Sequence, residues 1–428
     1  MPLPPQVSLP LRSLIAVWLV GPIVALAADG RPVPLSSTIE GVQPMTGIVL
    51  WTDNDAAAEH PDAISLEYRY CGYDEVVGPG GEYDWGAIDN VLDEVAGRGH
   101  QAVLRFYWCY VGKRTTVPRF VRDRDDYRET VGRSEGEKTH FCDWSNTALQ
   151  EFALQFYSRF ADRYDDDPRL AFLQTGFGLW GEYHIYEGPL TGRRSLGKTF
   201  PDKDYQARFL RHLDEEFASL PWSISIDAAD STYSPLEDND DLLGLGFGLF
   251  DDSFLCKPHP KENAVNWAIL RPERWQRHPA GGEFSYYNRR DQRKALSPSG
   301  PNGVSFEQAA RQFHISYMIG NDQPEYVSVD RIREAAAWTG YRFRVTAARE
   351  TAAGLELTVT NEGVAPIYRD AFFAAGGQRA AESLRGLLPG KELRCTIPGA
   401  GRRDGLSVAI ESDAILPGQR VGFAASLK

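Results

Sequence analysis

Eight strand-like segments alternate with helical patterns or long loops, and this alternation constrains the fold more than any other feature of the sequence. The segments are rich in apolar and aromatic residues and lie at 46–51, 64–70, 101–108, 170–176, 222–228, 244–250, 282–287 and 313–319. The run between the second and third segments repeats its apolar residues at helical spacing and ends in two glycines. Strands that alternate with helices indicate a parallel sheet. Eight of them over about 300 residues predict a (β/α)8 barrel, or TIM barrel.

The composition changes near residue 340. Residues 341–428 contain no tryptophan and consist of short strand-like segments broken by turn residues. Segments of this kind at close spacing predict a small β-sandwich, of immunoglobulin-like type. We therefore expect the barrel over 28–340 and the β-sandwich over 341–428. Without tryptophan platforms, the second domain is expected to be a structural cap or spacer rather than a carbohydrate-binding module.

The N-terminus has the pattern of a secretory signal peptide. Arg12 precedes an apolar run that ends in Ala-Leu-Ala at 25–27, a plausible cleavage site. The run is interrupted by Gly-Pro at 21–22 and is short for a membrane span of roughly 20 residues. We expect residues 1–27 to be removed and the chain to be exported to the periplasm or beyond, without a membrane anchor. An uncleaved N-terminal anchor is the alternative.

The charge balance limits the partners. The chain carries a net charge of −13, and the acidic excess lies in the predicted barrel. This excess argues against nucleic acid or anionic lipid as a partner, because both would be repelled. A neutral or cationic ligand is easier to accommodate.

The five cysteines show no C-x-x-C spacing, so neither a zinc knuckle nor a redox pair is indicated. Export permits a disulfide, and Cys71 with Cys109 is the preferred pair because both follow neighbouring predicted strands. Buried free thiols are the equal alternative.

Two glutamates occupy positions at which a barrel places its catalytic groups. Glu182 follows the fourth predicted strand and Glu283 lies on the seventh. Active sites of (β/α)8 barrels form at the carboxyl ends of the strands. Hydrolysis of a glycosidic bond needs two carboxyl groups there, one protonated to assist the leaving oxygen and one ionised. The pair therefore predicts a glycoside hydrolase acting on an oligo- or polysaccharide.

Charged residues also fall on the predicted inner face of the strands. If apolar side chains face the surrounding helices, alternation turns a second set inward, namely Glu67, Arg69, Arg105, Asp227 and His314. Buried charges must be paired, so such a set forms either an ion-pair network or a functional site. Either arginine near Glu283 would keep that carboxyl group ionised.

Aromatic residues accompany these charges at the strand ends. Sugar rings present C–H faces that stack on aromatic side chains, and the candidates are Trp51, Trp108, Trp180, Tyr183, Tyr286 and Tyr287. Each alone is compatible with core packing, but six at one rim favour a sugar site. The residues expected to bind substrate are Arg69, Arg105, Trp108, Trp180, Tyr183, His184, Asp227 and Tyr287.

The run 64–106 resembles the early barrel of retaining glycoside hydrolases of the cellulase and β-galactosidase clan, with its "YDWGAI" helix entry and "VLRF" strand. More closely, "GLWGEYH" and "VTNEGVAPIY" are similar to a bacterial family of exported proteins with glycosidase-like barrels, a domain of unknown function with a G-x-W-G-E-x-H motif. The resemblance implies that Glu182 is the general acid/base, that Glu283 is the nucleophile and that Arg69 supports it. One departure is Gly181, since the clan has an asparagine there that binds the sugar 2-hydroxyl.

Other readings of these residues stay open. A barrel that binds carbohydrate without cleaving it would keep the aromatic rim and lose one carboxylate. Glu182 and His184 form an E-x-H pair that could hold a metal with Asp227, Asp251 or Asp252, but no strong zinc motif occurs, so we expect no metal. The chain has no G-x-S-x-G elbow, phosphate loop or dinucleotide fingerprint, so no organic cofactor is expected.

Overall fold

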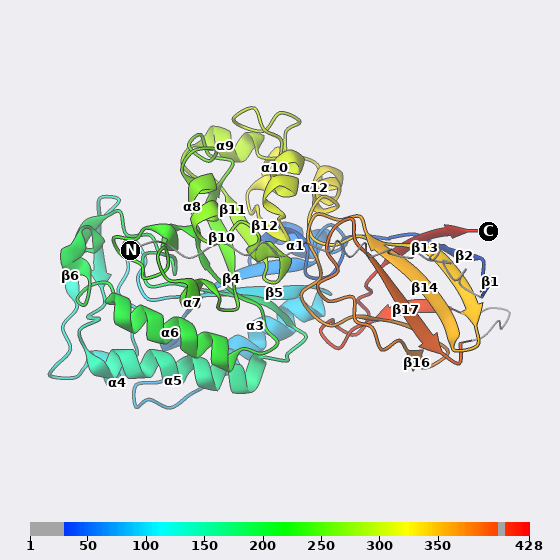
Figure 1. Cartoon of the computed structure of the whole chain (residues 1–428). Helices are drawn as coiled ribbons and strands as arrows, with labels where there is room; N and C mark the ends of the chain where they lie inside the picture. The colour runs from blue at the N-terminus through cyan, green and yellow to red at the C-terminus, as the bar shows by residue number, and fades with distance from the viewer. Residues whose placement is uncertain (1–29, 401–406) are drawn as a thin grey trace, which may run out of the picture.

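The computed structural model describes residues 30–400 and 407–428, so the predicted signal peptide, 1–27, lies outside the described residues. Eight parallel strands close into a barrel (Figure 1). In barrel order they are β10 (Phe247–Phe254), β11 (Ala280–Phe284), β12 (Tyr317–Ile319), β3 (Gly47–Trp51), β4 (Leu66–Gly72), β5 (Gln101–Tyr107), β8 (Leu170–Thr175) and β9 (Trp222–Ser225). Each predicted segment supplies one strand, which confirms the (β/α)8 barrel. Among the described residues, no helix has the length and apolar character needed to cross a membrane.

Helices cover the outside of the barrel. Those of more than one turn are α1 (Asp55–Glu59), α3 (Gly86–Gly97), α5 (Thr147–Tyr164), α6 (Lys203–Glu216), α8 (Asn263–Ile269), α9 (Arg289–Lys294), α10 (Phe306–Phe313) and α12 (Val329–Ala336). Single turns are α2 (Tyr73–Val76), α4 (Arg119–Arg122), α7 (Asp240–Leu243) and α11 (Gln323–Tyr326), with η1 (Gly188–Leu190), η2 (Arg193–Ser195), η3 (Ile226–Ala229) and η4 (Arg274–Gln276). The hairpin β6 (Thr130–Ser134) and β7 (Glu137–Phe141) extends a loop after β5.

Helix α5 shows how sequence fixes such an element. The side chain of Asn146 accepts a hydrogen bond from the Leu149 N–H and so caps the first turn. Phe156 and Phe160 follow one turn apart and both pack against Phe106 on the outer face of β5. Their burial attaches the helix to the barrel.

The inner face of β4 is the opposite of the one predicted. Tyr68 lies in the barrel core, whereas Glu67 and Arg69 face outward. Glu67 is fully buried there between His100, at 2.6 Å, and Arg98, at 2.5 Å. These two partners allow a carboxylate on the helix-facing side, so the expectation of an apolar outer face was wrong for this strand.

His314 also lies away from the barrel interior, contrary to the prediction. It ends α10 in the left-handed conformation, and its ring stacks on Trp275 with the ring centres 3.4 Å apart. Its Nδ1 is 2.6 Å from the carbonyl oxygen of Val364, in the C-terminal part of the chain. The residues that face inward on β12 are Tyr317 and Ile319.

A separate C-terminal sheet domain is present, as predicted (Figure 1). One sheet contains β13 (Phe343–Thr351), β14 (Gly354–Asn361), β17 (Glu392–Pro398), β19 (Phe423–Leu427), β1 (Arg31–Pro32) and β2 (Leu35–Ser37), and the other contains β15 (Phe372–Ala375), β16 (Gln378–Arg379) and β18 (Val408–Glu411). Both sheets contribute to one apolar cluster, in which the rings of Phe373 and Phe423 lie 5.2 Å apart. Residues 31–37, which the sequence assigned to the barrel, belong to the first sheet.

The sheet domain packs at the amino ends of the barrel strands. Gln101, the first residue of β5, donates a hydrogen bond to the carbonyl oxygen of Ala414 at 2.9 Å. Tyr341 donates to the carbonyl oxygen of Pro44, just before β3, at 3.0 Å. The carboxyl ends of the strands, where the predicted site lies, are therefore at the opposite end from this domain.

All five cysteines are free and buried, so the preferred Cys71–Cys109 disulfide is not present. The loop after β5 instead brings the sulfur of Cys109 to 3.7 Å from that of Cys142. Sequence distance between strands could not indicate this neighbour, because the hairpin after β5 returns Cys142 to the barrel.

Candidate active site

Arg105 on β5 is the centre of the site. Its side chain is fully buried inside the barrel. Nε donates to Oε1 of Gln174 at 2.7 Å, and Nη1 donates to Glu182 and, at 3.3 Å, to the hydroxyl of Tyr70. The guanidinium carbon lies 4.3 Å from the ring centre of Phe250. A guanidinium cannot lose its charge, so the surrounding residues must include an anion.

Glu182 reaches Arg105 because of a tight turn after β8. Trp180 and Gly181 adopt φ values of 57° and 70°, two successive left-handed residues that reverse the chain. The Gly178 N–H donates to the Glu182 carbonyl oxygen at 2.7 Å, and the Leu179 N–H to that of His184 at 3.2 Å. The carboxyl group of Glu182 is thereby held in the barrel mouth, and the residue is only 3% exposed.

The glycine before Glu182 has a steric reason. A Cβ at Gly181 would lie 2.5 Å from the carbonyl oxygen of Phe106. A larger side chain such as asparagine does not fit here without displacing the turn. Glycine is therefore required at position 181 by this turn.

We expect Gly181→Ala to lower the free energy of unfolding by about 1–3 kcal/mol, because it adds both left-handed strain and a clash. Gly99→Ala is the matched control, since Gly99 follows the C-terminal end of α3 with φ of 83° but has no heavy atom within 4 Å of its Cβ position. Urea denaturation measures both. Equal losses in the two variants would show that the contact with Phe106 is unimportant.

Glu283 on β11 is the second buried glutamate of the site, at 8% exposed. Burial raises its pKa to about 7, the charge of Asp252 adds to the rise, and Arg105 opposes it. The pKa of Glu182 is raised well above its usual value, first by burial and then by Asp252, with Glu283 and Asp227 adding and Arg105 opposing. The site thus favours one proton on Glu182 and leaves Glu283 to ionise near neutrality.

Two aspartates complete the acidic surroundings. Asp252, on β10, and Asp227, in η3 after β9, are half-buried. Burial raises the pKa of Asp227 well above its usual value, and the charges of Asp252 and Asp251 add to this. Asp251 faces outward and is fixed by Asn263 at 2.8 Å and the Trp267 indole at 3.2 Å. This network sets the direction in which its neighbour Asp252 points.

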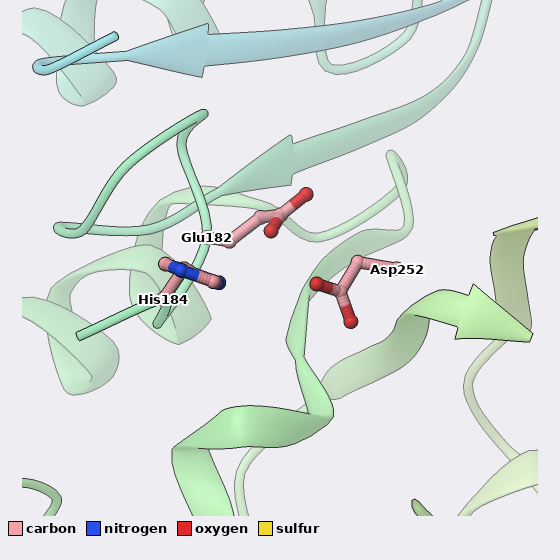
Figure 2. A group of neighbouring side chains, drawn as sticks. All are labelled: Glu182, His184 and Asp252. Atoms are coloured by element: carbon pink, nitrogen blue, oxygen red, sulfur yellow. The ribbon is translucent and has the colours of Figure 1, made fainter. Parts of the chain in front are cut away.

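His184 lies beside Glu182 and Asp252 (Figure 2). Burial lowers the pKa of His184, although the charges of Asp252 and Glu187 oppose this, so the neutral ring is favoured. Asp252 has a raised pKa because of burial and the charge of Asp251, while His184 and a hydrogen bond with Glu182 lower it. These three side chains form an interacting group at the mouth of the barrel.

Aromatic residues surround these acids. Trp180 is half-buried and meets the ring of Tyr110 edge-on at 6.4 Å. Tyr287 is 66% exposed, and Tyr286 donates its hydroxyl to Asp322 at 3.0 Å. Exposed rings beside buried carboxyl groups are suited to the apolar faces of a sugar.

Three of the expected substrate-binding residues lie elsewhere. Trp108 is fully buried and stacks on Tyr73 at 3.7 Å, and Tyr183 packs against Phe177 in the same core. Both are core residues. Arg69 faces outward and pairs with Glu75 at 3.1 Å, so it is Arg105 whose charge acts on Glu283.

The structure brings together Glu182, Glu283, Arg105, Trp180, His184, Asp227 and Tyr287 of the predicted set. Sequence reasoning did not include Tyr70 or Tyr186 in the site, and it named Asp252 only as a possible metal ligand. Tyr70 was missed because the inner face of β4 is opposite to the one predicted. Tyr186 interacts with Asp227 through a hydrogen bond.

The strand order and this site define a (β/α)8-barrel protein with two buried glutamates at the carboxyl ends of its strands. No protein-family model matches the chain, and no curated protein sequence matches it. Similar solved structures include a GH30 endoxylanase from Clostridium papyrosolvens C71, at 8% identity and a TM-score of 0.40 over 89% of this chain and 96% of that chain. Endo-glycoceramidase II from Rhodococcus sp., as a lactosyl-enzyme intermediate, has 12% identity and a TM-score of 0.43, over 85% of this chain and 100% of that chain. An α-galactosidase from Thermus thermophilus has 14% identity and a TM-score of 0.40, over 74% of this chain and 66% of that chain.

Proposed function

We propose that the barrel hydrolyses glycosidic bonds of an oligo- or polysaccharide with Glu182 and Glu283 as its two catalytic carboxyl groups. The observation that supports this most is that both are buried at the mouth of one barrel and interact with the same buried guanidinium. A glycosidase needs two carboxyl groups whose protonation differs. Export of the chain, predicted from its N-terminus, would place this activity outside the cytoplasm.

In this mechanism Glu182 donates its proton to the leaving glycosidic oxygen. Before substrate binds, Oε1 of Glu182 accepts a hydrogen bond from Arg105, and the charge of Asp252 favours the protonated form of Glu182. Glu283, ionised and balanced by the charge of Arg105, attacks the anomeric carbon or activates a water. Trp180 and Tyr287 are proposed to hold the sugar rings.

Hydrolysis of a panel of glycans tests this function. Neutral and amino-sugar polymers come first, because Asp227 and Asp252 surround the glutamates with negative charge. We expect reducing ends to appear with the native chain and to be lost with Glu182→Gln and with Glu283→Gln. Unchanged hydrolysis in both variants would remove these residues from catalysis. Retention of a glycan without any hydrolysis would identify a carbohydrate-binding barrel instead.

The rate is expected to rise with pH through about 7, because Glu283 must be ionised and its pKa is raised to about 7. A fall at higher pH follows when Glu182 loses its proton. Asp252→Asn removes a charge that raises the pKa of Glu283, so the rising limb should move to lower pH. The pH profile of kcat/KM measures both limbs.

The ion pair of Glu362 and Arg344 at the surface gives a control, since Glu362→Gln changes the net charge by the same amount far from the site. Its profile should match that of the native chain. A rising limb that does not move in Asp252→Asn would contradict the assignment of that limb to Glu283.

A further inference from the structure

Glu182, His184 and Asp252 each offer a ligand atom at one point of the barrel mouth. Their potential ligand atoms lie within 4.8 Å of one another. Figure 2 shows the three side chains converging from two elements, Glu182 and His184 from the loop after β8 and Asp252 from β10. A carboxylate, an imidazole and a second carboxylate thus surround one small space.

The backbone fixes this arrangement. Glu182 and His184 are two residues apart in a segment whose Leu179–His184 bridge closes the turn. On the other side, Asp252 follows Asp251, which is anchored by Asn263 and by the N–H of Ser253 at 3.0 Å. Side chains on a fixed backbone are preorganised for a ligand and lose little freedom on binding it.

His184 and Asp252 each have a side-chain atom that could bind a further partner. His184 Nε2 is enclosed, and it has no hydrogen-bond partner in the described residues 30–400 and 407–428. No lysine or arginine forms an ion pair with Asp252 in the same ranges, although Arg105 pairs with Glu182 nearby. An enclosed nitrogen without a partner and a carboxylate without a paired cation together point to a cationic ligand.

We propose that Glu182, His184 and Asp252 bind a divalent transition-metal ion of the zinc type. The imidazole favours such an ion over calcium or magnesium, which prefer oxygen ligands alone. Three protein ligands leave further positions to water, as in accessible zinc sites. Zinc bonds of about 2.0–2.2 Å require the side chains to close by roughly 1 Å from their present spacing.

The bound ion changes what the site can do. It occupies the carboxyl group that the proposed function uses as proton donor, so the ion and the proton compete for Glu182. If the proposed function holds, zinc is therefore an inhibitor that a chelator reverses. The metal site itself does not depend on that function, because it needs only the three side chains.

Metal binding by the whole chain, without any glycan, tests the site. Chelator-treated protein is titrated with Zn²⁺ by calorimetry and with Co²⁺ by visible absorption, which reports the ligand geometry. We expect one ion per chain. His184→Ala and Asp252→Asn should each weaken Zn²⁺ binding by about 100-fold or more, since even outer-sphere changes cost 10–100-fold.

Glu187→Gln is the matched control, because Glu187 lies on the same loop and its carboxylate accepts the Glu135 N–H at 2.8 Å. It should bind Zn²⁺ as the native chain does. Thermal unfolding without metal shows that each variant is folded, and His184→Gln replaces His184→Ala if the latter is not. No saturable binding, or equal binding in the His184 and Asp252 variants, would overturn the site.

Hydrolysis assays separate the two proposals. Inhibition by Zn²⁺ that a chelator reverses supports both of them. Hydrolysis that a chelator abolishes and Zn²⁺ restores keeps the metal site and overturns the mechanism with two carboxyl groups. Metal binding without hydrolysis of any glycan supports the metal site and contradicts the proposed function. Hydrolysis that Zn²⁺ does not change, together with no Zn²⁺ binding, supports the proposed function and contradicts the metal site.

Discussion

Glu182→Gln is expected to lower kcat/KM by about 10²–10⁴-fold on glycosides whose leaving group is a sugar or a simple alcohol. Such leaving groups depart only with a proton, and burial and the charge of Asp252 raise the pKa of Glu182 well above its usual value, which keeps a proton available for that task. The loss should be far smaller on 2,4-dinitrophenyl glycosides, whose leaving group is stable as an anion. Steady-state kinetics on the two substrate types measures the difference.

Glu283→Gln provides the contrast. Because its proposed role is in attack on the anomeric carbon, it should lose activity on both substrate types alike. Glu187→Gln, on the loop of Glu182 but outside the proposed pair, should lose little on either. An equal loss on both substrates for Glu182→Gln would contradict its role as proton donor.

Removing both glutamates together should destabilise the fold. Glu182→Gln combined with Glu283→Gln removes the ionised carboxylate of Glu283 and the carboxyl group of Glu182 that accepts from Arg105, so the fully buried guanidinium loses its balancing charge. Arginine cannot deprotonate, so we expect a loss of about 3–5 kcal/mol in the free energy of unfolding. Adding Arg105→Met should recover much of this loss, because the unpaired charge is then gone. Urea denaturation of the three proteins measures it.

Glu362→Gln is again the control, since Glu362 pairs with Arg344 at the surface. Exposed pairs contribute about 0–1 kcal/mol. A double variant as stable as this control, or a triple variant no more stable than the double, would show that Arg105 is not held by the two glutamates.

The sequence was sufficient for the barrel because each strand segment is rich in apolar and aromatic residues and is separated from the next by a helical pattern or a long loop. It was insufficient to predict which side chains of β4 point into the barrel. The alternation of residues defines two faces of the strand but does not tell which one faces the barrel interior. Glu67 can be buried on the helix-facing side only because Arg98 and His100 pair with it there. The same ambiguity misplaced Arg69.

The candidate site was predicted only in part. The positions of Glu182 and Glu283 were predicted from the ends of their strands. The inward position of Arg105 was predicted because the two faces of β5 were assigned correctly. Asp252 was not placed, because β10 extends past the predicted end at residue 250 and only its network with Asn263 decides which of two adjacent aspartates turns inward. The core positions of Trp108 and Tyr183 depend on how loops return to the barrel, which local sequence does not encode.

The pairing of β1 with β13 and of β2 with β19 makes the barrel an insertion within the sheet domain. A single cut near residue 340 therefore does not release two independent modules. The C-terminal fragment alone would lack β1 and β2, and the backbone edges that they cover on β13 and β19 would be left unpaired. The sheet domain is better produced with residues 30–40 either added as a separate peptide or fused to it. Proteolytic cleavage near residue 340 should leave two fragments that stay associated until they are denatured.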